Sequence, residues 1–128
     1  METSHHLGDL QLAIMRVLWK HGESTVADVH EAIEPERGLA LTTIATMLTK
    51  MEKKGVVDHR AEGRRFIYRP LVSESQVCRS MVSDLTSQLF RGDVTALVNH
   101  LLSEHDIDSG ELAQLREMIA SRERKEDR

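Results

Sequence analysis

One predicted helix, residues 42–54, carries hydroxyl and ammonium groups along one side and apolar groups along the other. At 100° per residue the apolar stripe is formed by Ile44, Met47, Leu48 and Met51. The opposite side is formed by Thr42, Thr43, Thr46, Thr49, Lys50 and Lys53. Hydroxyl and ammonium groups bind DNA phosphates, and a threonine methyl can contact the thymine methyl in the major groove. Because threonine is a poor helix former on a surface, this composition indicates a nucleic-acid contact, with an ordinary solvated surface as the alternative.

A second group of cations follows at a predicted β-hairpin. Alternating side chains predict strands over Val56–Glu62 and Arg65–Leu71, with a turn at Gly63 between them. A hairpin of this kind can lie along a phosphate backbone or enter the minor groove. The alternative is a solvated turn without a partner. The tip is expected to gather Arg60, Arg64 and Arg65.

The charge of the chain is distributed unevenly. The 128 residues carry a net charge of −4, which taken alone argues weakly against binding to nucleic acid. Residues 50–69 nevertheless hold seven Lys or Arg against three Asp or Glu, whereas residues 73–128 hold seven against eleven. The positive charge is therefore local and coincides with the helix and hairpin described above, as binding to a phosphate backbone requires.

Two further helices precede the polar helix. An apolar period of 3.6 residues predicts the first over residues 7–22. The second is expected to begin at Thr25, which forms a variant of the capping box with Asp28. Pro35 and Gly38 are expected to stop it, with Glu36 and Arg37 in the loop between them. Three helices followed by a hairpin predict a mainly α fold with a small β-hairpin wing, a winged helix-turn-helix DNA-binding domain over residues 1–72.

The remaining residues, 73–128, are predicted to form three amphipathic helices that act as a dimerisation domain. A helical unit of this size buries too little apolar surface to be stable alone. A second copy would cover the exposed stripes, and a two-fold dimer would place two DNA-reading helices about one turn of the duplex apart, or a multiple of it. The alternative is a tail packed on its own first domain. The apolar positions are Val77, Met81, Leu85, Leu89, Val94, Leu97, Val98, Leu101, Leu112, Leu115 and Ile119.

The sequence lacks the motifs of an enzyme, a metal protein or a membrane protein. It holds no phosphate-binding loop, no Gly-x-Ser-x-Gly and no paired zinc-ligand spacing. His100 and His105 are five residues apart, which turns them to different sides of a helix, so no metal or cofactor is expected. No apolar run reaches the length of a membrane span.

The only cysteine is Cys78, which excludes an intrachain disulfide and favours a reducing, cytoplasmic location. It is expected to be a small buried apolar residue near the start of a tail helix. The alternative is a thiol that makes DNA binding responsive to oxidation. A winged helix that binds proteins rather than DNA is a further alternative, which the cationic helix and hairpin disfavour.

Several stretches of the sequence resemble the BlaI/MecI/CopY family of winged-helix regulators, the penicillinase-repressor type. In the first domain they are LGDLQLAIMRVLW (7–19), TVADVHEAI (25–33), LALTTIATMLTKMEKKGVV (39–57) and EGRRFIYRPLVS (62–73). In the tail the matching stretch is ALVNHLLSEHDIDSGELAQLREMI (96–119). The most specific motifs are the TT-I…L…M-x-K-KG pattern and the G-R-x-F-x-Y wing. The resemblance covers about residues 7–120.

This resemblance implies a transcriptional repressor, not an enzyme, that binds a double-stranded operator with an inverted repeat as a homodimer. It implies that the third helix enters the major groove and that the wing contacts the backbone. The residues carried over are Thr42, Thr43, Thr46 and Lys50 in the groove and Arg60, Arg64 and Arg65 in the wing.

The family also suggests a signal that releases the repressor. Some members are inactivated when a membrane sensor-protease cuts an Asn-Phe bond in the tail. The matching bond here is His100-Leu101, so this possible proteolytic switch departs from the family pattern. Copper-responsive members carry Cys-x-Cys pairs, which a chain with the single Cys78 lacks.

Overall fold

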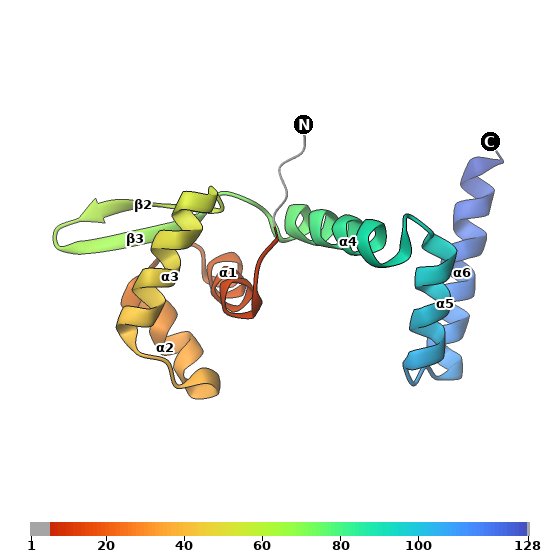
Figure 1. Cartoon of the computed structure of the whole chain (residues 1–128), viewed down its shortest axis with the longest axis horizontal. Helices are drawn as coiled ribbons and strands as arrows, with labels where there is room; N and C mark the ends of the chain where they lie inside the picture. The colour runs from red at the N-terminus through yellow and green to blue at the C-terminus, as the bar shows by residue number, and fades with distance from the viewer. Residues whose placement is uncertain (1–5, 128) are drawn as a thin grey trace. The chain divides into compact units, whose positions relative to one another are not determined.

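The three N-terminal helices and the hairpin occur in the predicted order. The computed structural model describes residues 6–127 and contains two compact units, the first ending at Asp84 and the second beginning at Leu85. The order of three helices followed by a β-hairpin confirms the predicted winged helix-turn-helix fold. The elements of the first unit are α1 (Asp9–His21), α2 (Val26–Arg37), α3 (Leu41–Lys54), β2 (Val57–Glu62) and β3 (Arg65–Pro70) (Figure 1).

A third strand completes the sheet, and the sequence did not predict it. β1 (Ser24–Thr25) pairs antiparallel with β3, which places β3 in the middle of the order β1-β3-β2. The β2–β3 register runs from Val57 opposite Pro70 to Glu62 opposite Arg65. Two residues are too few to show the alternation that reveals a strand, so the expected two-stranded hairpin is corrected to a three-stranded sheet.

The capping box at the start of α2 is confirmed, but the predicted break at Pro35 is wrong. The Asp28 N–H donates to the Thr25 hydroxyl at 3.1 Å, and the Thr25 N–H donates to the Asp28 carboxylate at 3.0 Å. The helix continues through Pro35, Glu36 and Arg37, which were expected to break it or to form a loop. Gly38 stops it as predicted, with a φ of 60° and an N–H that donates to the Glu34 carbonyl. Proline removes one N–H close to the helix end, and the bond from Gly38 closes the last turn.

The core of the first unit lies where the apolar sides of the helices meet the sheet. The predicted apolar side of α3 is buried, because Ile44, Leu48 and Met51 have no exposed surface and Met47 packs against the core. This packing fixes the rotation of α3 about its axis. The other elements contribute Ile14, Met15, Leu18, Val29, Val57 and Tyr68.

Helix α4 (Glu74–Phe90) begins in the first unit and ends in the second. Ser73 caps it as predicted, because its hydroxyl accepts the Gln76 N–H at 3.0 Å and the Gln76 side chain accepts the Ser73 N–H at 2.8 Å. Val77 is part of the core of the first unit. The boundary between the compact units therefore lies inside α4, while residue 72 stays the predicted end of the DNA-binding domain.

The second unit continues with α5 (Val94–Glu104) and α6 (Ser109–Glu126). Asp93 and Asp108 cap these helices, since each carboxylate accepts a backbone N–H of the first turn. None of the side chains described in this unit is buried. Within residues 6–127, no helix is both long and apolar enough to cross a bilayer.

Leu48→Ala is expected to lower the free energy of unfolding by about 2–5 kcal/mol, because it opens a cavity among fully buried side chains. Leu41→Ala in the same helix is the matched control: Leu41 is 47% exposed, and its truncation should change stability by less than about 0.5 kcal/mol. Urea denaturation followed by circular dichroism measures both variants. Equal losses would contradict the rotation of α3 described above.

Candidate nucleic-acid interface

The outer side of α3 is open to a ligand. All six polar residues predicted for this side are exposed, namely Thr42, Thr43, Thr46, Thr49, Lys50 and Lys53. The helix begins after Ala40, whose methyl side chain cannot cap the N–H groups of the first turn. The Thr43 N–H donates instead to the Ala40 carbonyl at 3.1 Å. Such N–H groups, at the positive end of the helix dipole, favour a phosphate.

Two polar residues of α3 are instead held by the protein itself. The Thr49 hydroxyl donates to the Ala45 carbonyl at 3.1 Å and interacts with the Tyr68 phenol. The Lys54 ammonium donates to the Gln11 side chain at 2.8 Å. The groups that face outward without such a bond in the described structure are therefore those of Thr42, Thr43, Thr46, Lys50 and Lys53.

The hairpin has two different faces, because side chains alternate along its strands. We define the aromatic face by Val57, His59, Ala61, Phe66, Tyr68 and Pro70. We define the charged face by Asp58, Arg60, Glu62, Arg65, Ile67 and Arg69. Residues that lie opposite each other in the register share a face, so the pairing of β2 with β3 determines this division.

The aromatic face joins the hairpin to α3. The His59 ring forms a hydrogen bond with the Glu52 carboxylate, and its centroid lies 4.4 Å from that of Phe66 and 5.2 Å from that of Tyr68. Tyr68 is buried, and this burial, together with the nearby Glu52 carboxylate, raises the pKa of its phenol above the ordinary value. These contacts hold the hairpin beside the C-terminal half of α3.

The charged face carries its own counter-ions, which corrects the prediction that three arginines gather at the tip. Arg60 lies on β2 and donates to Glu62 at 2.7 Å and to Glu23 at 2.9 Å. Arg69 donates to Asp58 at 2.6 Å. The hydrogen bonds from Arg60 and Arg69 lower the pKa of the Glu62 and Asp58 carboxyls, so these acids stay ionised beside the arginines.

The tip itself holds Arg64 and Arg65. Gly63 adopts a left-handed conformation with a φ of 63°, which allows the tight turn just before them. Arg65 lies 3.8 Å from the Glu62 carboxylate, in an exposed pair that contributes little energy. Arg64 is exposed, and within residues 6–127 no carboxylate lies at ion-pair distance from it.

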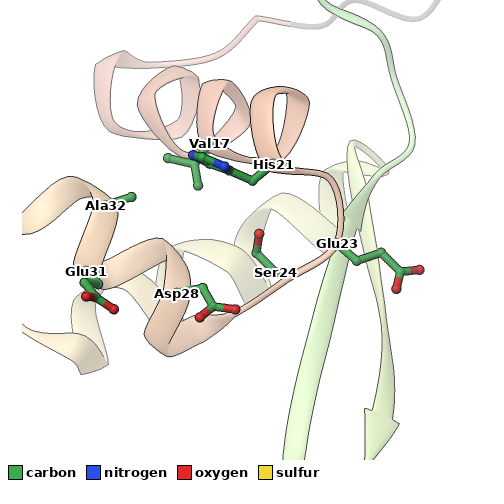
Figure 2. A pocket seen from close by; sticks show the side chains of 7 residues that line it. All are labelled: Val17, His21, Glu23, Ser24, Asp28, Glu31 and Ala32. Atoms are coloured by element: carbon green, nitrogen blue, oxygen red, sulfur yellow. The ribbon is translucent and has the colours of Figure 1, made fainter.

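A cleft between α1 and α2 is lined by acidic side chains, in contrast to the cationic wing tip. Figure 2 shows Asp28 and Glu31 on α2 across from His21 on α1, with Glu23 turned away toward the strands of the hairpin. Hydrogen bonds from the backbone and side chain of Thr25 lower the pKa of Asp28. Because carboxylates repel phosphates, this cleft is a poor nucleic-acid interface. In the described part of the chain, no three His, Cys, Asp or Glu side chains are placed to hold a metal ion.

The residues predicted for dimerisation lie in different environments. Val77 is only 1% exposed and has no surface left for a partner, which corrects its assignment. Leu97 and Leu112 are half-buried, and Met81 is half-buried against the core of the first unit. Leu102 and Met118 are exposed apolar side chains that the predicted set did not include. The exposed members of that set are Leu85, Leu89, Val94, Val98, Leu101, Leu115 and Ile119.

Cys78 and the His100-Leu101 bond are both at the surface. The expectation that Cys78 is buried is wrong, because the neighbouring Val77 takes the inward position and a step of 100° turns Cys78 outward. His100 and Leu101 lie within α5, where the His100 ring contacts the Phe90 ring at a centroid distance of 5.8 Å. A proteolytic cut at this bond would require α5 to unwind, because proteases bind extended chain.

Comparisons with known proteins agree with this architecture. The model of the penicillinase repressor family matches residues 7–121. The penicillinase repressor of Bacillus licheniformis is 26% identical over 119 residues, which cover 93% of each chain. The transcriptional regulator BlaI of Mycobacterium tuberculosis is 36% identical over 83 residues, which cover 64% of this chain and 60% of that protein.

Two solved structures match part of the chain. The solution structure of the DNA-binding domain of the repressor BlaI superposes with a TM-score of 0.52 at 34% identity, covering 59% of this chain and 93% of that chain. The Bacillus licheniformis BlaI monomer in complex with the blaP half-operator superposes with a TM-score of 0.51 at the same identity and coverage. Since the family model spans nearly the whole length, from the first helix into the last, the chain belongs to the penicillinase repressor family of DNA-binding transcriptional repressors.

Proposed function

We propose that this chain represses transcription as a homodimer that binds an inverted-repeat operator through α3 and the wing. The observation that carries the proposal is the outer side of α3, where exposed threonines and lysines lie opposite fully buried apolar residues. The relative whose structure contains the blaP half-operator supports a DNA target for this fold. A cytoplasmic location is part of the same proposal, and a DNA target is consistent with it.

In this proposal α3 enters the major groove. Thr42, Thr43 and Thr46 approach base edges and thymine methyl groups, while Lys50 and Lys53 bind phosphates beside the groove. Arg64 at the wing tip binds a further phosphate. Arg60 and Arg65 contribute less to the attraction, because carboxylates of the same protein already balance their charges.

The second unit supports dimerisation, because it has no core of its own. None of its described side chains is buried, yet α5 and α6 expose large apolar groups such as Val94, Leu101, Met118 and Ile119. Apolar surface on this scale marks an interface in a folded protein. A second copy of the same chain, related by a two-fold axis, covers both sets of groups at once and matches an inverted repeat in the DNA.

We also propose two places in the fold at which an inducing signal would act. Cleavage by a membrane sensor-protease at His100-Leu101 would cut α5 in the unit proposed to dimerise, and the dimer would be lost with it. The exposed thiol of Cys78 is the group through which oxidation would act.

Binding to a random-sequence duplex, measured by fluorescence anisotropy at two salt concentrations, tests DNA binding itself. We expect affinity to fall steeply as salt rises, because bound cations release counter-ions from the phosphates. A winged helix that binds only proteins would show no salt-dependent binding. Selection of bound fragments from a genomic pool then identifies the operator and the regulated promoters.

Arg64→Ala is expected to weaken binding to all sequences and to lower the slope of log affinity against log salt by about 0.9, the value for one phosphate contact. Arg124→Ala removes the same charge from α6 and is the matched control, with no change in slope expected. An unchanged slope for Arg64→Ala would remove the wing tip from the phosphate contacts.

Thr46→Ala is expected to weaken binding to the operator by roughly fivefold or more while it leaves non-specific affinity nearly unchanged, because the side chain meets base edges. Thr49→Ala is the control on the same helix, because the Thr49 hydroxyl is engaged with Ala45. Competition assays with operator and random duplexes measure the ratio. Equal losses for the two DNAs would refute base recognition by Thr46.

Ile119→Lys is expected to weaken dimerisation by more than about tenfold, because the dimer would bury an unpaired ammonium group. Ile119 is 59% exposed in the single chain, so the folded monomer should tolerate the lysine. Ala113→Lys, on the other side of α6, adds the same charge as a control. Sedimentation velocity over a range of concentrations reports the change, and a wild-type chain that stays monomeric throughout would overturn the dimer.

A further inference from the structure

Phe66 is an exposed aromatic side chain on the wing, and none of the DNA contacts assigned above includes it. The side chain is 49% exposed, whereas Tyr68, two residues further along β3 on the same face, is 3% exposed. The His59 ring lies beside both at centroid distances of 4.4 and 5.2 Å. A row of rings therefore runs from the core toward the hairpin tip, with Phe66 at its outer end.

The charged face of the hairpin is a poor surface for a DNA backbone. Its arginines Arg60, Arg65 and Arg69 each lie within ion-pair distance of a carboxylate, from Glu23, Asp58 or Glu62. A duplex laid on this face would have to displace those carboxylates or lie beside them. The like charge of carboxylate and phosphate makes either arrangement unfavourable.

The aromatic face is continuous with the side of α3 that is proposed to bind DNA. Glu52 of α3 is bonded to His59, and Thr49 of α3 interacts with Tyr68. Within the face itself no residue carries a carboxylate, and Glu52, which reaches the face from α3, is paired with His59. A backbone that follows α3 toward the hairpin therefore meets the aromatic face first.

Resting on the DNA-binding function proposed above, we propose that the wing meets DNA with its aromatic face and that the Phe66 ring packs against a deoxyribose of the backbone. The C–H groups of a sugar offer an apolar surface of the size of the exposed ring. Arg64, two residues away at the tip, supplies the adjacent phosphate contact. The wing then binds one stretch of backbone by two different interactions, one apolar and one ionic.

The salt dependence of binding separates these two interactions. Phe66→Ala is expected to weaken binding to operator and random duplex alike by about three- to tenfold, with an unchanged salt slope, because an apolar contact releases no counter-ion. Arg64→Ala lowers the slope. Leu71→Ala is the matched control, since Leu71 is an apolar residue of nearly equal exposure, 47%, just beyond β3, and it should bind as the wild type does.

The outcomes that overturn the inference are distinct from those that overturn the proposed function. If wild-type protein binds DNA with salt dependence and Phe66→Ala binds equally well, Phe66 has no DNA contact. If Phe66→Ala shifts the oligomeric state in sedimentation, the ring belongs to a protein interface instead. If wild-type protein shows no binding, the DNA-binding function itself fails. Phe66→Leu and circular dichroism control for folding, and the leucine variant should recover part of the affinity.

Discussion

Burial of three apolar side chains of α3 determines which side of this helix is exposed and can be proposed to meet DNA. Ile44, Leu48 and Met51 have no exposed surface, so the helix cannot rotate about its axis without opening the core. With that side fixed, Thr46 and Lys53 must lie outward. The surface proposed to meet a duplex is thus a consequence of core packing. Its polar residues supply the binding groups, but they do not set the orientation of the helix.

The wing is oriented by side chains that reach it from other elements. His59 is bonded to Glu52 of α3, and Arg60 is bonded to Glu23, which lies between α1 and β1. These exposed or half-exposed pairs contribute little to stability. Their effect is to give the hairpin one face that is electrically balanced and one that is aromatic, and this difference decides which face favours a phosphate backbone.

Much of this arrangement could be predicted from the sequence, because it depends on local periodicity. The spacing of Ile44, Leu48 and Met51 identified both sides of α3. The partner of Arg60, Glu23, lies 37 residues away in the chain, and no local pattern connects them. The prediction that Cys78 is buried was wrong because consecutive residues of a helix point 100° apart, so an error of one residue in the buried position turns a side chain from the core to the surface. The alternation of side chains along the strands is enough to divide the hairpin into two faces. The ion pairs that neutralise the arginines of one face are visible only in the structure.

The central claim is that the outer side of α3 and the hairpin together form the surface that meets the duplex. Titration of isotope-labelled protein with a short random-sequence duplex, followed by amide NMR shifts, tests it directly. The account predicts that the largest changes fall on Leu41–Lys54 and on the hairpin strands Val57–Glu62 and Arg65–Pro70. Changes confined to the acidic cleft between α1 and α2, with α3 unaffected, would contradict it.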